Sequence, residues 1–179
     1  MHLGTVTLET ERLILRKFRL EDAPDMYANW ASDDEVTRYL IWPTHAGPEV
    51  SREVIGGWLE GYDDPRQYLW CLEHKGEGRA IGSLGMVDQN AEGTVMEVGY
   101  CLGRAWWRQG LMSEALRAVL DFMFERVGVL ALEARIDERN IKSAGLLKKC
   151  GFKFNRIEAG AGRNNLGVYD PRFYRISRG

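Results

Sequence analysis

Three segments of the sequence carry residues whose types and spacing could do chemistry. The first, residues 99–115, reads as the end of a strand, a loop and the start of a helix. The first backbone N–H groups of a helix have no partner within it and lie at the positive end of its dipole, so they can bind a phosphate. Gly110 allows close approach to the backbone, and Arg104 and Arg108 add positive charge. An ordinary strand-to-helix turn with solvated arginines fits the same residues.

The second segment contains Asn140 and Ser143 at the start of a predicted helix, and the third contains Glu97 in a predicted strand. Asn140 is a favourable N-cap residue, and a serine in a first helical turn is usually a local hydrogen-bonding group. On a strand, Glu97 shares a face with Gly99 and Cys101, where a carboxylate beside small residues could act as a general base. Taken alone, a strand glutamate that faces water is the simpler interpretation of Glu97.

The composition excludes several classes of protein. The chain has 179 residues, of which 45% are hydrophobic and 28% charged, and we interpret residues 1–179 as a single globular domain. A net charge of −2 without a basic stripe argues against a nucleic-acid partner. No apolar run approaches the roughly 20 residues of a membrane span, and the first residues lack the features of a signal peptide. We therefore expect a cytoplasmic protein with no membrane contact.

Several metal-dependent and hydrolytic chemistries have no matching motif in the chain. The three cysteines are far apart and indicate neither a disulfide framework nor a zinc site. The three histidines form no H-E-x-x-H pair, and we expect no metal. A Walker loop, a dinucleotide-binding glycine motif and a G-x-S-x-G motif are also absent from the sequence.

The spacing of apolar residues predicts a mixed α/β (or α+β) domain with a central sheet. The predicted helices cover residues 23–30, 33–40, 50–59, 110–127 and 140–150. The predicted strands cover residues 13–15, 68–73, 80–87, 94–102, 129–136, 152–157 and 173–176. We expect the second to fourth strands to form an antiparallel meander with turns at residues 76–78 and 88–90.

Together, the three segments and their spacing resemble the GNAT superfamily of acyl-CoA-dependent N-acetyltransferases. The nearest branch is the RimJ/RimL-like one, the ribosomal-protein N-terminal acetyltransferases and their relatives. The resemblance covers nearly the whole chain and is carried by T-E-R-L-I-L-R from residue 10, E-V-G-Y from residue 97, residues 107–116, and Asn140-x-x-Ser143 with K-C-G-F from residue 149. It implies a mixed sheet of about seven strands flanked by helices, whose fourth strand carries a bulge and splays from the fifth.

The resemblance implies that acetyl-CoA is the co-substrate and lies in that opening. The strand edge implied for its pantetheine is Tyr100, Cys101 and Leu102. The loop implied for its pyrophosphate is Arg108, Gln109, Gly110, Leu111, Met112 and Ser113. In the family's loop pattern Q/R-x-x-G-x-G/A, Gly110 matches, Trp107 is a familiar variation of the branch, and Met112 departs from the pattern. Asn140 matches a position that contacts the cofactor.

The mechanism that the resemblance implies is direct transfer of the acetyl group to a primary amine in a ternary complex. Glu97 takes the amine proton, directly or through water, and a backbone N–H of the splayed strand stabilises the oxyanion. Many family members place a tyrosine general acid seven residues after the asparagine, but this chain has Leu147 there. Ser143 matches a residue proposed to replace that tyrosine near the thiol. We interpret Cys101 as a small buried strand residue rather than a nucleophile.

The acceptor amine is less defined than the co-substrate. In this fold the segment around the first two helices usually lines the acceptor side, and it contains Tyr39, Trp42 and His45. These rings could clamp a peptide N-terminus or a flat small molecule, and packing in the core or at a dimer contact explains them equally well. The sequence leaves protein N-termini and small-molecule amines open as acceptors, and a monomer and a homodimer open as assemblies.

Two other functions fit the same segments. Leu147 and Met112 motivate a catalytically silent acyl-CoA-binding or regulatory module. A phosphoribosyl or nucleotide ligand could also occupy the same helix N-terminus.

Overall fold

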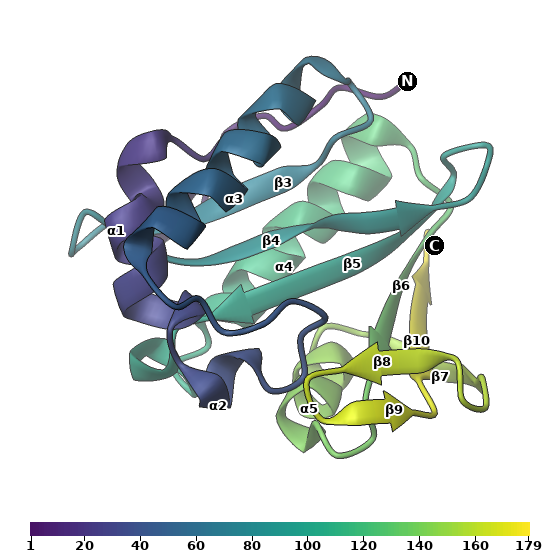
Figure 1. The fold of residues 1–179 in the computed structure, drawn as a ribbon. Coiled ribbons are helices and arrows are strands. Elements are labelled where there is room, and N and C mark those ends of the chain that lie inside the picture. The colour runs from purple at the N-terminus through teal and green to yellow at the C-terminus, as the bar shows by residue number, and fades with distance from the viewer.

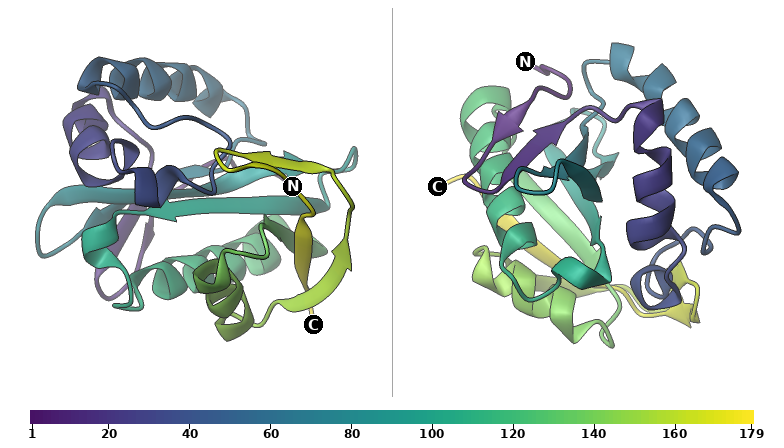
Figure 2. Two further views of the ribbon diagram at one scale, coloured as in Figure 1. Left: turned by 60° about the horizontal axis from the view of Figure 1, so that its bottom comes forward. Right: turned by 90° about the vertical axis from the view of Figure 1, so that its left-hand side faces the viewer.

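The computed structural model describes residues 1–179 and consists of one large sheet between two layers of helices (Figures 1 and 2). The strands are β1 (Leu8–Glu9), β2 (Leu13–Arg16), β3 (Leu69–His74), β4 (Arg79–Gln89), β5 (Val95–Leu102), β6 (Ala131–Ile136), β7 (Lys153–Ile157), β8 (Gly162–Asn164), β9 (Gly167–Tyr169) and β10 (Arg172–Ser177). The α-helices are α1 (Ala23–Met26), α2 (Asp34–Thr37), α3 (Pro48–Glu60), α4 (Leu111–Asp121) and α5 (Ile141–Lys149). Short 3-10 turns cover Leu20–Asp22, Gly61–Asp63 and Arg104–Trp106, and π-helical segments cover Tyr27–Ala31 and Phe122–Val127.

The main sheet has eight strands in the order β1-β2-β3-β4-β5-β6-β10-β7. All neighbouring strands are antiparallel except β5 and β6, which are parallel. This mixed sheet with flanking helices confirms the predicted fold class. No helix combines the length and the apolar character that crossing a membrane requires.

Helices α1 and α3 cover one face of the sheet, and α4 and α5 cover the other, as the left view of Figure 2 shows. The larger of two apolar clusters, with 28 buried residues, lies between the sheet and α4 and α5. The smaller, with 10 buried residues, lies under α1 and α3. Because side chains alternate along a strand, the odd- and even-numbered residues of β5 and β6 face different helical layers.

The ends of α4 and α5 follow from their capping residues. Gly110, at φ 79°, precedes α4, and Gly128, at φ 84°, follows the π-helical turn that continues it, which confirms the predicted stop. Asn140 caps α5 as predicted, since its side-chain oxygen accepts a hydrogen bond from the Ser143 amide at 3.2 Å. Gly151, at φ 91°, ends that helix.

The meander differs from the prediction at one turn and at one bulge. Strand β4 continues to Gln89, so the turn begins at Asn90, whose side-chain oxygen accepts the amide of Val95 at 2.9 Å. The predicted bulge in residues 94–102 was wrong. The register shifts between Met86 and Asp88, which makes Val87 of β4 the extra residue opposite β5.

The predicted helix at residues 33–40 is only one turn long, and three further strands, β1, β8 and β9, were not predicted. Strands β8 and β9 form a separate hairpin, drawn in yellow near α2 in Figure 1. The side-chain amide of Asn165, in its turn, donates to the carbonyl oxygens of Thr37 at 2.9 Å and Trp42 at 2.8 Å. Its backbone amide donates to the Leu40 oxygen at 3.2 Å. The hairpin therefore holds residues 37–42 in place.

Glu114 connects the N-terminal strands to the first turn of α4. Its carboxylate accepts hydrogen bonds from the Thr10 hydroxyl at 2.6 Å and from the amide and Nε of Arg12, both at 2.8 Å. Arg12 also donates to the Gln109 carbonyl at 2.9 Å, and so fixes the loop before α4. Burial acts to raise the pKa of Glu114, but the hydrogen bonds from Thr10 and Arg12 outweigh it and lower the pKa.

We expect Glu114→Gln to lower the free energy of unfolding by about 1–2 kcal/mol at pH 7. Because its folded-state pKa is depressed, the stability from this carboxylate is present above the unfolded pKa and is lost as pH falls through the folded pKa. Urea unfolding should therefore show a smaller gap between variant and wild type in acid. Glu53→Gln, on the exposed side of α3, is the control that should change nothing; equal stability of the two variants at pH 7 would contradict the role of Glu114.

Candidate active site

Strands β5 and β6 separate after three paired residues, of which the last pair is Glu97 and Glu133. From there to its end, β5 has no neighbour on the β6 side, which confirms the predicted splay. The opening belongs to a cleft of about 890 Å³ lined by residues of both helical layers, so it passes through the sheet. That volume is in the range of small-molecule sites.

The loop between β5 and α4 exposes a row of backbone donors. None of the six N–H groups of residues 108–113 donates to an acceptor within the chain. Arg108, at φ 62°, and Gly110, at φ 79°, adopt left-handed conformations that turn successive amides toward a common point. Gly110 has no side chain to cap α4. Together with the helix dipole, these groups form an anion-binding site.

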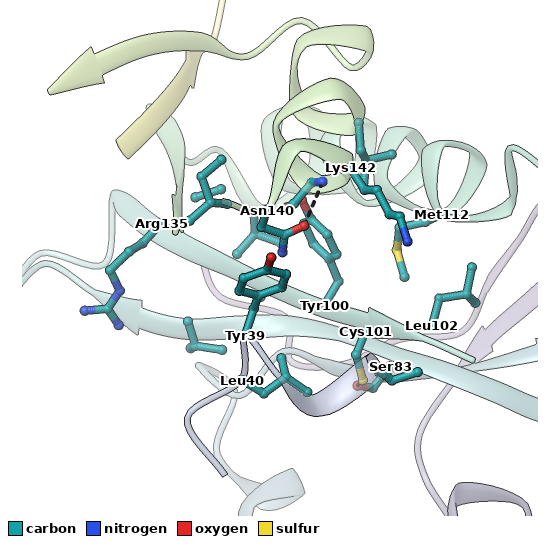
Figure 3. Close-up of a pocket in the computed structure, with 18 of the residues that line it drawn as sticks. Tyr39, Leu40, Ser83, Tyr100, Cys101, Leu102, Met112, Arg135, Asn140 and Lys142 are labelled. Atoms are coloured by element: carbon teal, nitrogen blue, oxygen red, sulfur yellow. Dashed lines mark hydrogen bonds between the residues drawn. The ribbon is translucent and has the colours of Figure 1, made fainter. Parts of the chain in front are cut away.

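Trp107 and Lys142 lie at the same end of the cleft from opposite sides. The Trp107 indole N–H donates to the Leu102 carbonyl at 2.7 Å, at the end of β5. The Lys142 ammonium lies 4.0 Å from the centre of the Trp107 ring, a cation–π contact between α5 and the loop. In Figure 3, Lys142 and Met112 lie together there. This end of the cleft is therefore positively charged.

Glu97 projects from β5 toward the α1–α3 side of the sheet and lines the cleft. Its carboxylate lies 3.2 Å from Nε of Arg135, and its side chain is 14% exposed. Burial raises the pKa of Glu97, Arg135 acts against burial, and the nearby carboxylates of Asp88 and Glu133 raise the pKa further. A carboxylate with a raised pKa in a cleft is suited to accept a proton.

Tyr100 projects to the opposite side of the sheet, toward α5. Its hydroxyl lies 2.6 Å from the Ser143 hydroxyl, and both residues line the cleft. Burial strongly raises the pKa of Tyr100, so the phenol keeps its proton at neutral pH. Leu147 is fully buried in the apolar core, and no proton donor occupies that position.

Tyr39 and Trp42, the residues expected to contact the acceptor, form part of one wall of the cleft. The Tyr39 hydroxyl donates to the Arg139 carbonyl at 3.1 Å, which links residues 37–42 to the segment before α5. In Figure 3 the Tyr39 ring lies close to Asn140. Trp42 lines the cleft on the same side. His45 does not line the cleft, because it is buried and its Nδ1 lies 2.8 Å from the Ser51 hydroxyl.

The cleft brings together nearly all the residues singled out from the sequence. Those that line it are Tyr39, Trp42, Glu97, Tyr100, Cys101, Leu102, Arg108, Gly110, Leu111, Met112, Ser113, Asn140 and Ser143. Gln109 does not line it, and its side chain donates to the Ala105 carbonyl at 2.9 Å. Burial raises the pKa of Cys101 to about 11, and its sulfur lies 3.2 Å from the Ser83 hydroxyl. Cys101 is therefore a buried thiol at neutral pH, as expected.

The lining residues that the sequence analysis did not single out include the polar side chains of Arg135, Asp137, Tyr169 and Lys142. Asp137 is nearly fully buried; hydrogen bonds from Arg139, together with one from Asn164, lower its pKa to about 2. For Arg135 and Asp137 a signal existed, since they follow the alternation of charged and buried apolar residues along β6, which places both on the same side of the strand as Glu133. Tyr169 had no such signal.

A comparison with protein families identifies the family of the chain. The model of an acetyltransferase (GNAT) domain matches residues 12–153. The chain belongs to the GNAT family. It is 34% identical over 149 residues to the uncharacterized N-acetyltransferase p20 of Bacillus licheniformis, a match that covers 82% of each chain. This GNAT chain is therefore an acetyltransferase, in agreement with the resemblance seen in the sequence.

Solved structures agree with the GNAT fold. A GNAT acetyltransferase from Bacillus anthracis has a TM-score of 0.84 at 20% identity and covers 97% of this chain and 99% of its own. RimL, a ribosomal L7/L12 alpha-N-protein acetyltransferase in complex with coenzyme A, has a TM-score of 0.85 at 16% identity and covers 96% of this chain and 98% of its own.

Proposed function

We propose that the protein transfers an acetyl group from acetyl-CoA directly to a primary amine in a ternary complex. The observation that carries this proposal is the row of six unpartnered amides beside a splayed strand, in one cleft with the buried carboxylate of Glu97. The amides can donate hydrogen bonds to a pyrophosphate, and the free edge of β5 can pair with an amide-containing arm. Glu97 can accept a proton from an amine. The complex of RimL with coenzyme A, in the same fold, supports the choice of cofactor.

Two parts of the cofactor bind at two different places in the cleft. The amides of residues 108–113 bind the pyrophosphate, and Lys142 and Arg108 add charge there. The edge of β5 from Tyr100 to Leu102 pairs with the pantetheine arm and leaves the thioester at the splay. Asn140, at the start of α5, lies on the opposite side of the opening (Figure 3).

Glu97 acts as the general base. A primary amine must lose a proton to attack the thioester carbonyl, and Glu97 takes that proton directly or through one water. Arg135, 3.2 Å from the carboxylate, keeps Glu97 ionised against the effect of burial. A backbone N–H of β5 stabilises the oxyanion, and holding both substrates in one cleft supplies much of the rate.

The acceptor amine enters from the side of Tyr39 and Trp42. A peptide N-terminus fits this side, and the neighbours in structure named ribosomal-protein acetyltransferases support it. A small-molecule amine is the second class to test, because fold likeness does not establish a substrate.

The first test is calorimetric titration of the protein with acetyl-CoA, with ADP as the control. We expect binding on the order of −8 kcal/mol, much tighter than that of ADP. A panel of peptide N-termini and small amines then follows in a thiol-release assay. Binding without transfer to any amine would instead support a silent acyl-CoA-binding module, and equal binding of ADP would support a nucleotide ligand.

The hydrogen bonds from Asn165 to residues 37–42 lead to a prediction about the binding of the acceptor amine. We expect Asn165→Ala to raise KM for the amine by about 3- to 10-fold, because two hydrogen bonds to the Thr37 and Trp42 carbonyls are lost. The affinity for acetyl-CoA should not change. Asn90→Ala is the matched control, since Asn90 organises a turn outside the cleft. A change in acetyl-CoA affinity with an unchanged amine KM would contradict this role.

A further inference from the structure

The Tyr100 and Ser143 hydroxyls form a hydrogen-bonded pair, and by geometry alone either oxygen could be the donor. Each hydroxyl has the other as its only hydrogen-bonding partner in the chain, at 2.6 Å. A phenol is more acidic than an aliphatic hydroxyl and is the better donor, so the Tyr100 proton lies toward the Ser143 oxygen. The proton of Ser143 is then free to point elsewhere.

The Ser143 hydroxyl does not bond to its usual alternative partner. A helical serine commonly donates to the carbonyl four residues earlier, which here is Arg139. The Arg139 carbonyl accepts the Tyr39 hydroxyl at 3.1 Å and receives no bond from Ser143. Both Ser143 and Tyr100 line the cleft, so the Ser143 O–H has the cleft as its remaining direction.

We propose that Tyr100 is a positioning residue that orients the Ser143 hydroxyl toward the sulfur of the leaving thiolate. This inference rests on the proposed acetyl transfer. In that step the amine nitrogen forms a bond to the acyl carbon, the carbon–sulfur bond breaks, and its electron pair goes to sulfur. Glu97 holds the amine proton. The thiolate accepts the hydrogen bond of Ser143 and leaves unprotonated, and no proton moves along the Tyr100–Ser143 pair.

The two hydroxyls stabilise the thiolate through a cooperative chain of hydrogen bonds. A hydroxyl that accepts a hydrogen bond becomes a stronger donor, so Tyr100 strengthens the bond from Ser143 to sulfur. This accounts for departure of a thiolate in a chain whose position 147 is a buried leucine. It also predicts an effect on bound coenzyme A that needs no amine.

The test is the ionisation of the thiol of bound coenzyme A, followed by the ultraviolet absorbance of its thiolate. We expect the ionisation constant to be about tenfold higher in the wild type than in Ser143→Ala, which is the effect of one hydrogen bond to a charged group. Tyr100→Phe should fall between them. Tyr100→Phe in the Ser143→Ala background should change nothing further, because Tyr100 acts only through Ser143.

The wild type, the two single variants and the double variant also form a double-mutant cycle that can be measured by kinetics. We expect both single variants to lower kcat with little change in KM, and the double variant to match Ser143→Ala. Tyr62→Phe is the matched control. This partly buried phenol does not line the cleft; it accepts a hydrogen bond from the Phe18 amide and donates one to the Leu69 carbonyl, and its loss should leave thiol ionisation and kcat unchanged. Thermal unfolding checks that each variant folds.

The outcomes separate the two proposals. If coenzyme A does not bind, the acetyl-transfer proposal and this inference both fail. If coenzyme A binds and amines are acetylated, but thiol ionisation is the same in all four proteins, the inference fails and the transfer proposal stands. Independent, additive losses from the two single variants would also overturn the inference, because they would give Tyr100 a role apart from Ser143.

Discussion

Glu97→Gln is expected to lower kcat/KM for amine acetylation by about 10²- to 10⁴-fold, while the affinity for acetyl-CoA stays unchanged. Glutamine keeps the size and the hydrogen-bonding reach of the side chain but cannot accept the amine proton. Thiol release measured against amine concentration gives the kinetic loss, and calorimetry gives the affinity. Turnover that survives unchanged with several amines would show that Glu97 is not the base.

The pH profile gives a second measure of Glu97. The base must be ionised, so kcat/KM falls as pH falls through its pKa, and burial moves that fall above the ordinary value of 4.5. Asp88→Asn is the informative control, because the Asp88 charge raises the pKa of Glu97. That variant should keep its activity at high pH and shift the acid limb downward.

The contribution of Glu97 to the free energy of unfolding should fall as pH rises, whereas its contribution to activity should increase. The folded-state pKa of Glu97 is raised, so its contribution to stability is full below the unfolded pKa and is lost as pH rises through the folded pKa. The stability of Glu97→Gln relative to the wild type should therefore be higher at neutral pH than at pH about 4. Urea unfolding at the two pH values measures this difference, and a relative stability that is equal at the two values or lower at neutral pH would contradict it.

Gly110→Ala is expected to weaken acetyl-CoA binding by about 5- to 30-fold. Gly110 lies at φ 79°, where a residue with a Cβ carries about 1–2 kcal/mol of strain. The nearest atom to an added Cβ is Arg12 Nη2 at 3.6 Å, an ordinary contact, so strain and not a clash causes the loss. The loop relaxes without ligand, and binding must restore the conformation that directs its amides at the anion.

Gly128→Ala is the matched control for that prediction. Gly128 lies at φ 84° with open space around an added Cβ, so its strain is similar, and it is at the far end of the helix from the cleft. Thermal unfolding should show a loss of stability for this variant, and calorimetry an unchanged affinity. If both variants bind acetyl-CoA as tightly as the wild type, the amides of residues 108–113 do not form the anion site.

The fold and much of the cleft could be predicted because their signals are local in the sequence. Apolar periodicity marks α4, and Asn140, Gly128 and Gly151 mark helix ends by their capping preferences. The anion site follows from a glycine at a strand-to-helix junction. These features depend on neighbouring residues and not on distant contacts.

The features that were missed depend on tertiary contacts. The β8–β9 hairpin is rich in glycine and asparagine and has no alternation of apolar residues. It is held in part by hydrogen bonds from Asn164 to Asp137 and from Asn165 to residues 37–42. The bulge at Val87 is a property of the β4–β5 register, which sequence spacing does not define. The Tyr100–Ser143 pair joins residues 43 apart, and only the splay brings them together.

The β8–β9 hairpin lies apart in the sequence from the residues proposed to bind the cofactor, so the two parts of the cleft can be changed separately. The GNAT family model ends at residue 153, so the hairpin that holds the acceptor-side residues lies beyond the part of the chain that carries the family pattern. Under the proposed function, substitution or exchange within residues 158–170 is expected to alter which amine is accepted and to leave the loop of residues 108–113 unchanged. On that proposal, the choice of acceptor can be redesigned through a short segment near the C-terminus.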